Sequence, residues 1–140
     1  MKGYPHWTLR ALVGTTTAIV ATGLLLTPGT LVMRAGMDLA WMLPSDGRLV
    51  TAALHATAGF PLMLFIGALW SIHMRAGWRK GRRRASGLAL ALTMPLLALS
   101  AVGVYYFGGE RLAAWAAYGH LGIGAIMVAL FAWHWMTRRH

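Results

Sequence analysis

Residues 112–137 read LAAWAAYGHLGIGAIMVALFAWHWMT, a run of 26 residues without Asp, Glu, Lys or Arg. A run of about 20 apolar residues is long enough to cross a hydrocarbon core of about 30 Å as an α-helix. Three more runs lack these charges, at residues 11–33, 49–74 and 85–109. A backbone in lipid must satisfy its own hydrogen bonds, and none of the runs alternates as barrel strands do. The sequence therefore predicts four membrane-spanning helices.

The composition agrees with a membrane protein. Of 140 residues, 58% are hydrophobic and 11% are charged, whereas a soluble domain carries about twice that charged fraction. The absence of cysteine excludes disulfides, iron–sulfur clusters and covalent attachment of c-type haem. We expect an all-α, integral membrane four-helix bundle that forms a single transmembrane domain over residues 1–140. Its helices are expected at about residues 7–27, 48–74, 86–107 and 111–137.

The connection between the first two helices contains two expected features. Pro28 and Gly29 should end or kink the first helix, because proline removes a backbone donor. The apolar segment Leu31–Leu43 is interpreted as a helix lying in the interface at the outer surface. A turn follows, and Asp46 is expected to cap the second helix.

The positive charges predict how the chain is oriented. The net charge is +10, and the connection between the second and third helices holds six cations and no acid: Arg75, Arg79, Lys80, Arg82, Arg83 and Arg84. Both tails add cations on the same side of a four-helix chain, whereas three acids balance three arginines on the other side. The positive-inside rule then predicts cytoplasmic N- and C-termini. A nucleic-acid-binding patch would not need this alternation of sides, so we expect no nucleic-acid partner.

Four of the six histidines lie within two of the expected helices: His55, His73, His120 and His134. An ionisable residue inside a membrane is costly and indicates a functional site. His120 and His134 are fourteen residues apart, which places both on one helix face, about 21 Å apart along the axis. His55 and His73 are eighteen residues apart, which is again one face, with about 27 Å between them.

The second and fourth helices run in the same direction, so these histidines form two layers. His55 and His120 lie in an outer layer, and His73 and His134 lie in an inner layer. Two facing imidazoles would give a six-coordinate haem iron with no open position, which suits electron transfer. We therefore predict two haem b groups with these four histidines as ligands of the iron. The two spacings differ by about 6 Å, so a single haem is the alternative, with His73 at headgroup level.

Glycines near the histidines would make room for a haem ring. Gly59 and Gly124 each follow an outer-layer histidine by four residues. This spacing suggests a weak internal repeat, in which the first two helices form one unit and the last two form the other. Weaker candidates for ring clearance are Gly14, Gly23, Gly87, Gly103, Gly119 and Gly122. The alternative for the glycines is close packing of helices, and the alternative for any one histidine is an interhelical hydrogen bond.

Several motifs resemble those of a known family. They read His55-Ala-Thr-Ala-Gly59, His73-Met-Arg-Ala-Gly-Trp78-Arg, Val104-Tyr-Tyr-Phe-Gly-Gly-Glu110-Arg, His120-Leu-Gly-Ile-Gly124 and His134. Residues 50–138 resemble the small four-helix dihaem b-type cytochromes of bacterial inner membranes. These include the cytochrome b membrane subunits of thiosulfate reductase, formate dehydrogenase and hydrogenase type, and the flavinylation-associated cytochromes. The resemblance implies a multi-pass protein of the bacterial inner membrane, with quinone, a flavin domain or another haem protein as redox partner.

Three functions compete for this sequence. The first is transmembrane electron transfer on b-type haem, by an electron-transfer protein or redox-complex subunit rather than a stand-alone enzyme. The second is a cofactor-free membrane anchor for a larger enzyme complex. The third is a metal transporter with methionine and histidine ligands, although methionine is a common apolar residue of membrane helices. We prefer the first, because the two histidine layers agree with a topology derived independently from the charges.

Overall fold

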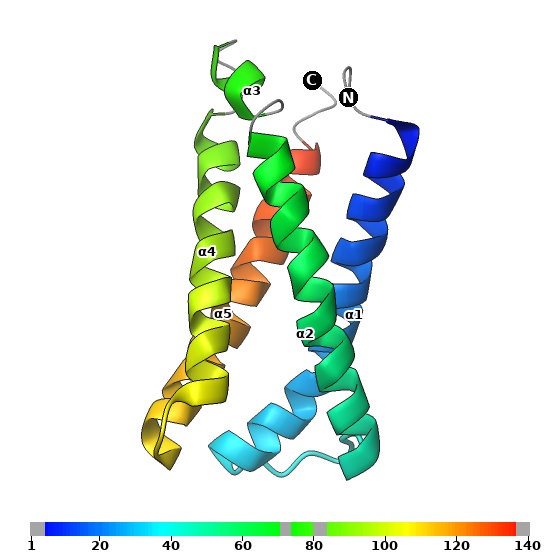
Figure 1. Cartoon of the computed structure of the whole chain (residues 1–140). Helices are drawn as coiled ribbons and strands as arrows, with labels where there is room; N and C mark the ends of the chain where they lie inside the picture. The colour runs from blue at the N-terminus through cyan, green and yellow to red at the C-terminus, as the bar shows by residue number, and fades with distance from the viewer. Residues whose placement is uncertain (1–4, 71–73, 80–83, 137–140) are drawn as a thin grey trace. The chain divides into compact units, whose positions relative to one another are not determined.

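The computed structural model describes residues 5–70, 74–79 and 84–136. These ranges form five helices and contain no strand (Figure 1). The helices are α1 (His6–Ala35), α2 (Ser45–Leu69), α3 (Arg75–Arg79), α4 (Arg84–Tyr106) and α5 (Glu110–Met136). The expected all-α fold is confirmed, and the bounds of α4 and α5 lie within two residues of those predicted.

The four long helices have the length and surface of membrane spans. α1, α2, α4 and α5 contain 30, 25, 23 and 27 residues, which corresponds to about 35–45 Å of helix. Leucine, phenylalanine and tryptophan side chains are exposed along them, including Leu64 and Phe60 at 75%. Such a surface is unfavourable in water. The described part of the chain thus has four helices long and apolar enough to cross a membrane, consistent with a multi-pass membrane protein.

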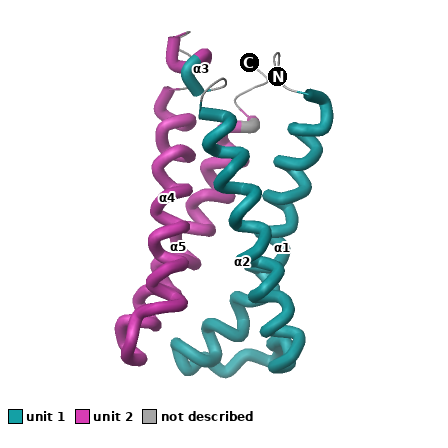
Figure 2. The backbone as a smooth tube through the Cα atoms, in the orientation of Figure 1, with its two compact units in different colours: residues 1–75 teal, residues 76–140 magenta. Residues whose placement is uncertain are grey.

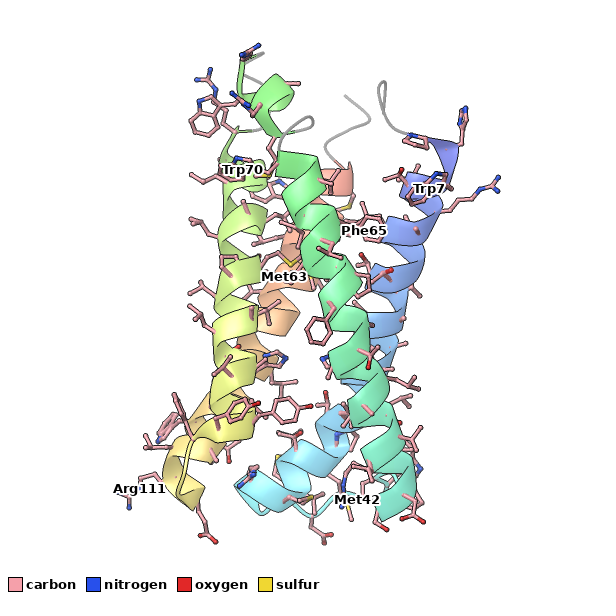
Figure 3. All side chains as sticks on the ribbon, in the orientation of Figure 1. Trp7, Met42, Met63, Phe65, Trp70 and Arg111 are labelled. Atoms are coloured by element: carbon pink, nitrogen blue, oxygen red, sulfur yellow. The ribbon has the colours of Figure 1, made fainter. Side chains whose placement is uncertain are left out.

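The chain divides into two compact units, residues 1–75 and residues 76–140 (Figure 2). In unit 1, α1 packs against α2, and in unit 2, α4 packs against α5. Each unit is therefore an antiparallel helical hairpin, as the suggested repeat of a helix pair predicts. In unit 1, Trp7 and Trp70 lie at the same end of the hairpin and Met42 lies at the other (Figure 3).

Small residues let the two helices of unit 2 approach closely. Ala113 and Ala117 of α5 are each 8% exposed. A Cβ atom added at Gly103 of α4 would lie 3.0 Å from the Cβ of Ala116 and 3.0 Å from the Phe107 ring. Dense packing of small residues is the usual source of helix association in lipid. Helix packing, rather than clearance for a haem ring, accounts for Gly103.

The structure changes the expected end of the first helix. α1 continues through Pro28 to Ala35, and its cyan C-terminal part turns sharply away from the rest (Figure 1). The expected separate interfacial helix over Leu31–Leu43 is not shown, because residues 31–35 belong to α1 and residues 36–44 are not helical. A helix survives an internal proline as a kink, since only one backbone bond is lost. Gly36 ends α1 with a left-handed φ of 64°.

The expected cap of the second helix also needs correction. Asp46 does not cap α2, because the helix begins at Ser45 and the N-cap position is Pro44. Asp46 lies instead in the first turn, where its negative charge interacts favourably with the positive end of the helix dipole. The basic connection contains the short helix α3, and the Arg84 guanidinium donates two hydrogen bonds, at 3.0 and 2.8 Å, to the carbonyl of Trp78.

The contact at Gly103 generates a prediction about stability. Gly103→Ala should destabilise the protein by about 1 kcal/mol or more, because the new methyl group forces α4 and α5 apart. Gly87→Ala on the same helix is the matched control, since a Cβ atom there meets nothing within 4 Å. Thermal unfolding in detergent, followed by circular dichroism, measures both. Equal midpoints for the two variants would contradict this role of Gly103.

Candidate functional site

His55 of α2 is held by α1 within unit 1. Its ring is half-buried, and its Nδ1 atom lies 2.9 Å from Oγ1 of Thr22. The backbone of Ile19 also interacts with the ring. These contacts fix the orientation of the imidazole relative to α1.

Gly23 allows the His55 ring to lie against the backbone of α1. A Cβ atom at Gly23 would lie 3.2 Å from Cε1 and 3.7 Å from Nδ1 of His55. A larger residue would therefore require the ring to shift by a few tenths of an ångström, next to its contact with Thr22, the residue that precedes Gly23. The sequence predicted space for a haem edge at Gly23. In the structure, the His55 ring lies in that space.

His120 of α5 is held in the same way within unit 2. Its Nδ1 atom lies 2.9 Å from Oγ of Ser100 on α4. His120 is the eleventh residue of α5, and His55 is the eleventh residue of α2. Each outer-layer histidine is therefore about 15 Å from the start of the second helix of its hairpin. The repeat proposed from sequence extends to the depth and the hydrogen bonding of these two imidazoles.

His134 repeats the contact one layer along unit 2. Its Nδ1 atom lies 2.9 Å from Oγ of Ser86, and Ser86 is 4% exposed. Ser86 precedes Ser100 by fourteen residues, which is also the spacing from His120 to His134. The predicted common face of His120 and His134 is confirmed, because both rings contact α4.

The remaining predicted site residues have different outcomes. His73 lies outside the described residues. A Cβ atom at Gly59 would meet no described atom within 4 Å, and one at Gly124 would meet only Leu97 Cδ2 at 4.0 Å. Helix packing within the hairpins therefore explains Gly103 but not Gly59 or Gly124. The clearance hypothesis for these two glycines stays a prediction.

The hydroxyl partners of the histidines were not predicted from the sequence: Thr22, Ser86 and Ser100. Serine and threonine are common in membrane helices, so their presence alone gave no signal. The serine spacing of fourteen residues in one run, equal to the histidine spacing in the next, was the available signal. In an antiparallel hairpin, equal spacings bring both pairs into register.

The arrangement offers imidazole rings with a fixed orientation. Since Nδ1 of His55, His120 and His134 faces a hydroxyl, a metal would be bound at these residues through the other ring nitrogen, Nε2. Among residues 5–70, 74–79 and 84–136, no three His, Asp or Glu side chains gather into a metal-binding group. A haem with two axial histidines needs one imidazole on each face of the ring. Comparisons with protein-family models, curated proteins and solved structures found no match to this chain.

Proposed function

We propose that this protein carries electrons across a membrane on b-type haem. The observation that supports the proposal is the repeated contact of a helical histidine with a hydroxyl of the neighbouring helix. It occurs at the same depth in both hairpins, at His55 and His120, and again fourteen residues along α5 at His134. Two outer histidines would hold one haem, and His134 with His73 would hold a second.

The histidine environment fits an axial ligand of haem iron. Histidines that bind metals usually donate their other N–H to a carboxylate, a backbone carbonyl or water, which fixes the ring. Here serine and threonine hydroxyls take that place at Nδ1. When bound, haem b supplies an iron that accepts and releases one electron. The residues of this chain would orient the imidazoles and surround them with apolar side chains that exclude water.

The charge distribution supports a location and partners for this function. We place the chain in a bacterial inner membrane as a multi-pass protein with cytoplasmic termini, because its basic connection and both basic tails lie on one predicted side. Electrons would pass between quinol, or a protein redox partner, and an acceptor on the opposite side. Such a chain would serve as an electron-transfer protein or as a subunit of a larger redox complex.

A cofactor-free membrane anchor is the second candidate, and the same contacts favour it. A histidine–hydroxyl bond between two helices stabilises a hairpin in lipid by about 0.6 kcal/mol on average. His55, His120 and His134 each form such a bond. In an anchor, these bonds would be the whole role of the imidazoles.

The haem content of the purified chain separates the two candidates. We expect about two haem b per chain, measured as pyridine haemochrome on detergent-purified protein from cells well supplied with haem. His120→Ala should remove the outer haem alone and halve the content, and His134→Ala should remove the inner one. The reason is that each substitution removes one axial ligand of one haem.

His6→Ala is the matched control, since His6 is exposed at the first turn of α1 and should leave the haem content unchanged. A ratio near one would retain the cytochrome and exclude the inner pair. Full haem in both the His120 and His134 variants would overturn the ligand assignment. Wild-type protein without haem would leave the anchor as the better account.

The orientation can be tested separately, because the chain has no cysteine. Single substitutions Arg111→Cys and Arg79→Cys place a thiol on opposite predicted sides of the membrane. In intact spheroplasts, an impermeant maleimide should label Cys at position 111 at least tenfold faster than at position 79. Lysis should make the two rates similar. Faster labelling at position 79 would reverse the proposed orientation.

A further inference from the structure

The hydroxyls that contact the outer histidines also contact backbone carbonyls of their own helices. Thr22 Oγ1 lies 2.6 Å from the carbonyl oxygen of Ala18 and 3.1 Å from that of Ile19. Ser100 Oγ lies 2.9 Å from the carbonyl oxygen of Leu97. A hydroxyl has a single proton to donate, and a carbonyl oxygen can only accept. The direction of the bond to histidine follows from where that proton goes.

The carbonyl contacts require the hydroxyl proton. Two oxygens 2.6–2.9 Å apart with no proton between them repel, and this distance is typical of an O–H···O bond. The hydroxyls of Thr22 and Ser100 therefore donate to the carbonyls of Ala18 and Leu97. The same oxygens must then accept a hydrogen bond from the Nδ1–H groups of His55 and His120, both at 2.9 Å.

We infer that Thr22 and Ser100 are positioning residues that hold His55 and His120 in the tautomer with the proton on Nδ1. A neutral imidazole carries one proton, so the lone pair then lies on Nε2. A relay of two hydrogen bonds, from imidazole to hydroxyl and from hydroxyl to backbone carbonyl, orients each ring, and the backbone of Ile19 adds a contact to His55. The hydroxyl selects which nitrogen is a base or a ligand and in which direction its lone pair points.

The consequence for iron rests on the proposed function, whereas the tautomer does not. A donated Nδ1–H bond makes the imidazole a more basic ligand and orients its ring. A more basic ligand favours ferric over ferrous iron and lowers the midpoint potential. Loss of such a bond commonly costs about 10- to 100-fold in metal affinity. Thr22 and Ser100 would therefore influence haem binding and potential without contacting the haem.

The tautomer can be measured directly on the full chain. Protein labelled with [15N]histidine is purified in detergent from haem-deficient cells, and the resonances are assigned with His55→Gln and His120→Gln. Protonated and unprotonated ring nitrogens have well-separated 15N chemical shifts. We expect Nδ1 to be protonated and Nε2 unprotonated in both residues at a pH where imidazole is neutral. A proton on Nε2 of either histidine in the wild type would overturn the inference.

Hydroxyl deletions test the cause of this preference. Ser100→Ala should increase the share of His120 with the proton on Nε2, Thr22→Val should do the same for His55, and Thr22→Ser should restore the wild-type spectrum. Thr16→Val and Thr93→Val are matched controls, because their hydroxyls contact the carbonyls of Leu12 and Leu90 in α1 and α4. Unchanged histidine spectra in both deletion variants would overturn the role of the hydroxyls.

Haem-loaded protein gives the second measurement. Ser100→Ala should lower haem affinity about tenfold and raise the midpoint potential of the outer haem, whereas Thr93→Val should do neither. An unchanged potential with a changed tautomer would refute the link to the iron. If the wild type binds no haem, the proposed function fails, while the 15N result still decides the tautomer.

Discussion

An imidazole surrounded by hydrocarbon must satisfy its polar nitrogens within the protein, because lipid offers no hydrogen-bond partner. In each hairpin of this chain, a hydroxyl on the neighbouring helix meets that requirement at Nδ1. The bond joins His55 to Thr22 in unit 1, and it joins His120 to Ser100 in unit 2. Such a bond forms only when the two helices have one particular depth and rotation relative to each other. The position of the histidine therefore constrains the pairing of the helices around it, and the close approach at Gly23 follows from the same constraint.

The hydroxyl is suited to this task because serine and threonine can also bond to the backbone of their own helix. A hydroxyl alone in lipid would carry the cost of its own unsatisfied proton. The Thr22 hydroxyl donates a hydrogen bond to the carbonyl of Ala18, and the Ser100 hydroxyl donates one to the carbonyl of Leu97. The polar chain thus ends in the helix backbone after two steps. Few polar atoms are needed, so the surface of the hairpin can remain apolar.

A structural contact and a ligand-orienting contact use the same atoms, so the hydrogen bonds support both candidate functions. The repetition favours the haem proposal, because stability alone does not require the same position along the second helix of each hairpin. His55 and His120 are each the eleventh residue of their helix. One bond anywhere along each hairpin would serve an anchor equally well. A pair of haem ligands, in contrast, must lie at one level in the membrane, since an axial imidazole is needed on each face of one ring.

The amino-acid sequence by itself determined the four apolar helices, the hairpin repeat and the face shared by His120 and His134, because each depends only on local composition and helical periodicity. The uncharged runs predicted α4 and α5 to within two residues, and the fourteen-residue spacing placed His120 and His134 on one face. Only the tertiary structure decided that Gly23 lies against the His55 ring and Gly103 against the Ala116 methyl group. It also decided which hydroxyls meet the imidazoles. These features depend on distances between helices, which no periodicity along one helix contains.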